Sequence, residues 1–235
     1  MRQIILDTET TGLEPSQGHR IIELAGVEVL SRRMTGNHFH RYLNPGRKSD
    51  EAAKQVHGIE DDFLLDKPKF GDVAKEFIDY VSGAELIIHN APFDLAFLNN
   101  ELSLAGFKRV QDYVVSVTDT LIVAKELHPG KRNNLNALCD RYQIDNSKRT
   151  LHGALLDAEL LGEVYLAMTR GQESLIMDLD GPSPRESGVA DVHRQHDLIV
   201  QYASIDELAD HQKVLANIAK ESKGQALWLI LATQQ

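Results

Sequence analysis

The first 45 residues contain three short runs rich in apolar and β-branched residues, joined by brief connections that show no helical pattern. The runs are Gln3–Asp7, Leu24–Leu30 and Phe39–Leu43, and the turn Asn44-Pro45-Gly46 closes the third. Runs of this length and composition predict strands, and Pro and Gly mark where a strand ends. Because consecutive parallel strands need a long crossover, usually a helix, the arrangement predicts an antiparallel meander.

Helical patterns begin after this block and then alternate with further strands. Helices are predicted over Asp72–Val81, Pro92–Leu104, Thr118–Leu127 (with Thr118 as the N-cap), Asn133–Tyr142 and Ala154–Met168. Strands are predicted over Glu85–His89 and Val114–Val117. Strands in a block, followed by strands that alternate with helices, are typical of a mixed sheet. Residues 1–170 are therefore predicted to form an α/β domain, a mixed sheet flanked by helices.

The composition changes at Gly171, and residues 171–190 are predicted to be a flexible linker because they are interrupted by Gly, Pro and Ser. Residues 191–235 are predicted to form a strand over His196–Ala203, a helix over Ser204–Ser222 and a strand over Ala226–Leu231. A unit of about 45 residues buries too little surface to be stable by itself. This favours docking to a partner through Trp228 over a tail that packs back onto its own domain.

The net charge of −10 argues against a protein that grips a long stretch of nucleic acid, which needs a basic surface. It does not exclude an enzyme that holds a few nucleotides through divalent cations, since these reverse the local charge. No run approaches about 18 consecutive apolar residues, so no membrane span is expected. The single cysteine, Cys139, cannot form an internal disulfide and is expected in the core of a cytoplasmic protein.

The first acidic motif is Asp7-x-Glu9, directly after an apolar strand. Residues two apart in a strand share one face, so this strand presents paired carboxylates at one end of the sheet. Two such close carboxylates repel unless a cation lies between them, and hard oxygen ligands suit Mg²⁺ or Mn²⁺. Acids at a strand end that merely face solvent are the alternative interpretation.

Two further acidic positions lie at the starts of predicted helices. Asp94 follows Asn90-Ala91-Pro92 in a first turn, where the helix dipole by itself stabilises a carboxylate. Asp157 shares a helix face with Leu160, Leu161 and Val164, and an unpaired carboxylate on an apolar face is costly. His152 is expected in the loop just before this helix.

Taken together, the segments DTETTG, HNAPFD and HGALLD resemble the three motifs of the DEDDh family of 3′–5′ exonucleases, with His152 as the h. VHGI (56–59), HPGKRN (128–133) and the residues around HGALLD are similar to proofreading subunits of bacterial replicative DNA polymerases. The resemblance implies a ribonuclease H-like fold and two divalent ions, Mg²⁺ or Mn²⁺, held by Asp7, Glu9, Asp94 and Asp157. It also implies that Asp7 bridges both ions and that His152 is the general base that deprotonates the attacking water.

Substrate contacts follow from the same resemblance. His57 is expected at the terminal nucleotide with Glu51 nearby, and Asn90 and Phe93 are expected to line the groove beside the metal ligands Asp7, Glu9 and Asp157. Lys131, Arg132, Lys148 and Arg149 are either contacts to backbone phosphates or ordinary solvated charges.

The expected partners are a DNA 3′ end, preferably mispaired, and the catalytic (alpha) subunit of a polymerase, which the C-terminal segment would bind. A small accessory (theta-like) subunit is a further expected partner. Gln172, Leu175 and Met177 form either a peptide that binds a sliding clamp or a frayed helix end. Two rival functions remain, an RNA-directed relative and a catalytically silent structural subunit of a polymerase. A doubly wound nucleotide-binding protein is disfavoured, because no glycine-rich loop follows a strand.

Overall fold

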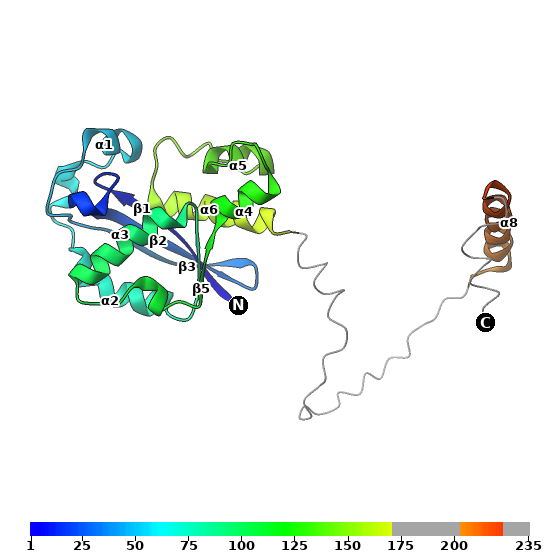
Figure 1. Ribbon diagram of the computed structural model, residues 1–235, viewed down its shortest axis with the longest axis horizontal. Helices are drawn as coiled ribbons and strands as arrows, with labels where there is room; N and C mark the ends of the chain where they lie inside the picture. The colour runs from blue at the N-terminus through cyan, green and yellow to red at the C-terminus, as the bar shows by residue number, and fades with distance from the viewer. Residues whose placement is uncertain (171–202, 223–235) are drawn as a thin grey trace, which may run out of the picture. The chain divides into compact units, whose positions relative to one another are not determined.

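The computed structural model of the chain describes residues 1–170 and 203–222 (Figure 1). Contacts between Cα atoms separate the chain into two units, Met1–Pro182 and Ser183–Gln235. Among the described residues, no helix is both long and apolar enough to cross a membrane.

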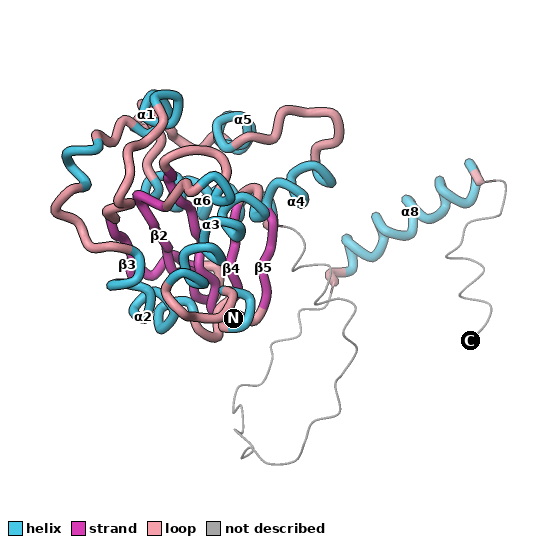
Figure 2. The backbone as a smooth tube through the Cα atoms, turned by 60° about the vertical axis from the view of Figure 1, so that its left-hand side comes forward, coloured by secondary structure: helices cyan, strands magenta, loops and turns pink. Residues whose placement is uncertain are grey.

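The first unit is built on a five-stranded sheet with the order β3-β2-β1-β4-β5, and Figure 2 shows the sheet running from β3 to β5. The strands are β1 (Arg2–Thr10), β2 (Ile21–Leu30), β3 (Arg33–Tyr42), β4 (Glu85–Ile88) and β5 (Ser116–Asp119). β1, β2 and β3 pair as an antiparallel meander, whereas β4 pairs in parallel with both β1 and β5. The predicted mixed sheet is confirmed, and β1 is its central strand.

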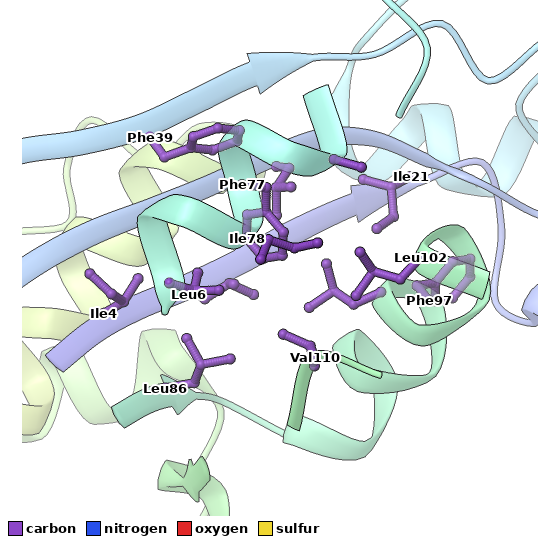
Figure 3. Close-up of a cluster of buried hydrophobic side chains, with 14 of the residues drawn as sticks. Ile4, Leu6, Ile21, Phe39, Phe77, Ile78, Leu86, Phe97, Leu102 and Val110 are labelled. Carbon is purple, nitrogen blue, oxygen red and sulfur yellow. The ribbon is translucent and has the colours of Figure 1, made fainter. Parts of the chain in front are cut away.

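Helices cover both faces of this sheet. They are α1 (Glu51–His57), α2 (Phe70–Val81), α3 (Ala91–Leu104), α4 (Thr120–Leu127), α5 (Leu135–Tyr142) and α6 (Ala154–Met168), with short 3₁₀ turns at Pro15–Gln17, Asp61–Leu64 and Val110–Asp112. Successive side chains of a strand point to opposite faces. Ile4 and Leu6 accordingly pack in one apolar cluster with α2 and α3 (Figure 3). Ile5 packs in a second cluster with α4, α5 and α6.

One prediction about helices was wrong, and one helix was missed. Thr118 does not cap α4, because β5 continues to pair with β4 through Asp119, which moves the start of the helix. The Asp119 side chain is the cap and accepts a hydrogen bond from the Leu121 backbone N–H at 2.9 Å. Helix α1 was not predicted at all. Of its seven residues only His57 is buried, so the sequence carries no apolar stripe there.

The second unit contains helix α8 (Ile205–Glu221), as predicted. Ser204 is its N-cap, and the capping box with Glu207 is formed in both directions. The predicted strand over Ala226–Leu231 with Trp228, and all but the last residue of the one over His196–Ala203, lie outside the described residues. The predicted linker, 171–190, and its residues Gln172, Leu175 and Met177 lie outside them as well.

Candidate active site

Strand β1 carries the first two acids of the candidate site. Ile5, Asp7 and Glu9 alternate along the strand, so all three point to the face that α6 covers. Glu9 is buried. The predicted shared face of the two carboxylates therefore lies against a helix and not in solvent.

Helix α6 places Asp157 against this strand. Asp157 lies in the first turn of α6 and is only 3% exposed. Helix α6 packs closely on the sheet, since a Cβ atom on Gly162 would lie 2.5 Å from the terminal methyl of the Met34 side chain and 3.4 Å from Ile5. One ligand atom each from Glu9, His152 and Asp157 lie within 4.8 Å of one another.

Helix α3, which follows the parallel strand β4, carries the fourth acid, Asp94. Its N-cap, Asn90, adopts a left-handed conformation with φ 67°, which turns the chain sharply from β4 into the helix. Asp119 holds this turn by accepting a hydrogen bond from the Asn90 backbone N–H at 3.0 Å. Asp94 is buried near the helix N-terminus and accepts a hydrogen bond from the Thr8 hydroxyl at 2.7 Å.

Burial and mutual repulsion make these carboxylates resist ionisation. The pKa of Asp7 is raised well above its usual value by burial and by the charges of Asp94, Glu9 and Asp157. Burial, with the charge of Asp157 next, raises the pKa of Glu9 to about 8. Burial likewise raises the pKa of Asp94 to about 7, although the Thr8 hydrogen bond opposes the shift. Asp7, Glu9 and Asp94 therefore ionise together at neutral pH only if a cation compensates their charge.

His152 lies in the loop before α6, as predicted, with its side chain 46% exposed. Its backbone N–H donates to the carbonyl of Val56 at 3.1 Å, which ties the loop to α1. The ring Nδ1 lies 3.5 Å from Oδ2 of Asp157. Burial and the nearby Arg149 charge lower the pKa of His152, so the imidazole is neutral at pH 7 and can accept a proton.

The structure adds two charged residues that sequence reasoning did not assign to the cluster. Arg149, predicted only as a possible phosphate contact, donates to both carboxylate oxygens of Asp157. Glu23, opposite Glu9 on β2, is a fifth buried carboxylate whose charge raises the pKa of Glu9. An acid inside an apolar run could have indicated Glu23, but the predicted strand, Leu24–Leu30, began one residue after it.

Glu23 also connects the sheet to the start of α6. Its Oε2 accepts a hydrogen bond from the Ala154 backbone N–H at 3.1 Å, and its Oε1 lies 2.7 Å from Nε2 of His40. The Ala154 N–H is one of those left without a partner at a helix N-terminus. Glu23 thus fixes the turn of α6 that carries Asp157.

A cleft of about 440 Å³ opens beside the acids. Asp7, Glu9 and Asp94 line it, together with Phe93 and His57. His57 is buried, and its Nδ1 accepts a hydrogen bond from the Ile59 backbone N–H at 2.9 Å, which leaves the proton on Nε2. This Nε2 has no hydrogen-bond partner within the described part of the chain.

Gly12 shapes the turn at the edge of this cleft. A Cβ atom on Gly12 would lie 2.3 Å from the buried ring of His19, so any other residue would displace that ring. His19 is held by Thr11, whose hydroxyl oxygen lies 3.1 Å from its Nδ1. Thr11 and Gly12 of the first motif therefore both pack against His19 at the edge of the cleft.

The other predicted contact residues lie in different places. Asn90, Arg149 and His152 line an adjoining cleft of about 290 Å³, together with Asp7 and Asp157. Four predicted residues do not line either cleft and are exposed, namely Glu51, Lys131, Arg132 and Lys148. The residue before Glu51, Asp50, lines the first cleft in its place.

The model of the exonuclease family RNase_T matches residues 4–165. The chain belongs to this exonuclease family. It is 52% identical to the DNA polymerase III subunit epsilon of Escherichia coli (strain K12), with 97% of each chain covered. Identity to the epsilon subunit of Salmonella typhimurium is also 52% over 97% of each chain, and that of Haemophilus influenzae is 48% identical over 97% of this chain and 94% of the relative.

Solved structures agree in fold. Exonuclease X in complex with 5′-overhanging duplex DNA superposes with a TM-score of 0.56 at 24% identity, covering 73% of this chain and 92% of that one. The nuclease domain of 3′hExo, a DEDDh family member bound to rAMP, superposes with a TM-score of 0.59 at 20% identity, covering 72% of this chain and 92% of that one. The predicted ribonuclease H-like fold is confirmed. The predicted enzyme class, a metal-dependent exonuclease of the epsilon-subunit type, is confirmed as well.

Proposed function

We propose that the chain is the proofreading subunit of a replicative DNA polymerase, which removes mispaired 3′-terminal nucleotides with the help of two divalent ions, Mg²⁺ or Mn²⁺. The observation that carries this proposal is the meeting of Asp7, Glu9, Asp94 and Asp157 beside His152. These residues come from β1, α3 and α6, so only the folded chain assembles them.

The donor set fits divalent ions with hard oxygen ligands. All four acids offer carboxylate oxygens, and the raised pKa values of Asp7, Glu9 and Asp94 support a bound cation that offsets their charge. Asp7, central in the cluster, would bind both ions. Glu9 and Asp157 would bind the ion that activates the nucleophile, and Asp94 would bind the other ion. Such ions supply an activated water and stabilise the leaving 3′ oxygen of a phosphodiester.

His152 takes the proton from the attacking water in this mechanism. Its lowered pKa keeps the ring unprotonated at working pH, and its exposure gives the accepted proton a route to solvent. The Val56 carbonyl holds the loop that carries it at the mouth of the cleft. His152 therefore holds and releases a proton, whereas the acids position the reacting groups.

The 440 Å³ cleft would receive the terminal nucleotide. Phe93 and the exposed side chains of Leu13 and Val56 give it apolar walls on which a base can stack. His57 lines the same cleft, and its buried Nε2–H, which has no partner among the described residues, would donate to a sugar or phosphate oxygen. A strand must be single to enter such a cleft, and a mispaired end costs less to melt than a paired one.

Within the cell we propose a cytoplasmic complex in which the C-terminal segment binds the polymerase catalytic (alpha) subunit. The names of the relatives, subunits of DNA polymerase III, support this assembly. The net charge of −10 supports it too, because a partner would then supply the durable hold on DNA. A sliding clamp at Gln172, Leu175 and Met177 and a theta-like accessory subunit are further proposed partners.

Timed digestion of a 3′-mismatched primer by the purified chain tests the proposal. We expect stepwise loss of nucleotides from the 3′ end in Mg²⁺, faster than from a matched primer, and none with a chelator. Equal turnover of a matched RNA oligomer would favour the RNA-directed alternative. No nucleotide release in either Mg²⁺ or Mn²⁺ would favour the catalytically silent structural subunit.

A further inference from the structure

The guanidinium of Arg149 lies inside the acidic cluster. Its Nε donates to Oδ1 of Asp157 at 2.5 Å and its Nη2 donates to Oδ2 at 2.7 Å, so one side chain engages both carboxylate oxygens. The Arg149 side chain is 6% exposed and that of Asp157 is 4% exposed. Bidentate, charge-assisted pairs of this kind are among the stronger hydrogen-bonded contacts in proteins.

Two other residues hold the guanidinium in this place. Its Nη1 donates to Oδ1 of Asn136 on α5 at 2.8 Å, and its Nη2 lies 3.2 Å from each ring nitrogen of His152. The charge of Arg149 also opposes the rise in the pKa of Glu9. Arg149 therefore acts electrostatically as a cation placed among the acids.

A divalent ion ligated by Asp157 would need the same carboxylate oxygens. An ion and a guanidinium on one carboxylate would be like charges a few ångströms apart, screened little because the pair is buried. We propose that Arg149 and the divalent ion compete for Asp157, so that an ion enters only as the guanidinium leaves. This inference rests on the proposed metal-dependent hydrolysis and assigns to Arg149 the control of ion entry.

Calorimetric titration of the full chain with Mn²⁺ tests the competition directly. Removing the two charge-assisted hydrogen bonds in Arg149→Ala should lower the Kd for Mn²⁺ about tenfold. Lys148→Ala is the matched control, since it removes the same charge from the neighbouring, exposed residue of the loop. We expect its Kd to equal that of the wild type, which separates the direct contact from a general loss of positive charge.

Thermal unfolding gives a second readout and covers the case in which Arg149→Ala folds poorly. Asn136→Ala leaves Arg149 and Asp157 in place but removes one anchor of the guanidinium, so it should also tighten Mn²⁺ binding, by less. The rise in Tm on adding Mn²⁺ should be larger in both variants than in the wild type, because ligand stabilisation grows as Kd falls.

The outcomes separate this inference from the proposed function. An unchanged or weaker Mn²⁺ affinity in both Arg149→Ala and Asn136→Ala would overturn the competition. Tighter binding in Lys148→Ala equal to that in Arg149→Ala would overturn it as well, because charge alone would then explain the effect. A wild-type chain that binds no Mn²⁺ at all would instead refute the proposed metal-dependent mechanism.

Discussion

Along the central strand β1, Ile4–Leu6 and Asp7–Glu9 are neighbouring segments of three residues each, and both lie largely inside the protein. Ile4, Ile5 and Leu6 are fully buried among apolar side chains on the two faces of the sheet. The burial of these residues stabilises the fold, by about 1.5–3 kcal/mol for each side chain. The acids that follow, Asp7 and Glu9, lie in the protein interior at a cost, which their raised pKa values record. One strand thus shows that burial serves stability at one end and chemistry at the other.

The sharpest test of this contrast is Asp7→Ala. Metal ions contribute several kcal/mol to such reactions, so loss of a shared ligand should lower turnover by about 10³-fold or more. The Tm in chelator should not fall, because the substitution removes a buried carboxylate whose ionisation its neighbours oppose. Mn²⁺ binding should weaken for the same reason, and nucleotide release, Mn²⁺ calorimetry and thermal unfolding measure the three effects. Unchanged Mn²⁺ binding would contradict this account of Asp7.

His152→Ala should lower turnover by about 10²–10⁴-fold, the usual contribution of a general base. The fold and Mn²⁺ binding should persist, because the side chain is 46% exposed. His38→Ala, at an exposed histidine on β3, is the control and should keep wild-type turnover. A His152→Ala protein that works at the wild-type rate would remove His152 from the mechanism.

Leu6→Ala is the converse of Asp7→Ala on the same strand. Leu6 is fully buried in the cluster with α2 and α3, so its truncation should lower the free energy of unfolding by about 2–5 kcal/mol. Below the transition temperature, Mn²⁺ binding should match that of the wild type. Denaturant unfolding measures the loss, and a Leu6→Ala protein of normal stability with poor ion binding would reverse the contrast between Leu6 and Asp7.

Glu23→Ala tests the residue that links the strands to α6. The Ala154 N–H and His40 would lose their partner, which should cost about 1–3 kcal/mol of stability. Turnover should fall too, because the first turn of α6 carries Asp157. Glu23→Gln keeps an acceptor for the Ala154 N–H and should recover much of the lost stability and turnover. If Glu23→Ala changed neither Tm nor turnover, the link would have no functional role.

The smallest expected effect is a pH dependence that Glu9→Gln removes. Folding raises the pKa of Glu9 from 4.5 to about 8, so between these values the folded chain binds a proton that the unfolded chain has released. This residue therefore lowers stability progressively as pH rises through that window. Histidines with lowered pKa values, such as His57, contribute the opposite slope, so the difference between variant and wild type is the quantity to measure.

In chelator, the Tm of Glu9→Gln relative to that of the wild type should increase as pH rises from 4.5 towards about 8. Added Mn²⁺ should abolish this pH-dependent increase in the Tm difference, because the ion favours the ionised carboxylates of the wild type. A constant difference in Tm across the pH range would show that Glu9 is not strained by burial.

Sequence patterns predicted most of the fold where the residues of an element carry a clear apolar pattern of their own. The strand before Asp7 is a short continuous apolar run and the helix over Ala154–Met168 is rich in apolar residues, and each was found with the correct type. Helix α1 lacks such a stripe and was missed, although it carries His57. The cap of α4 was misplaced because pairing of β5 with β4, a tertiary contact, outweighed the local preference of Thr118.

The sequence by itself determined the chemical inventory of this protein: the acids Asp7, Glu9, Asp94 and Asp157, the neighbouring His152, and the apolar periodicities that bury them. Only the tertiary structure decided which charges share one space. It placed Glu23 beside Glu9 and Arg149 on Asp157, pairs that are 14 and 8 residues apart in the chain. Spacing along a chain fixes the face of a strand or helix, whereas the pKa of a buried group depends on every charge packed around it, whichever element supplies that charge.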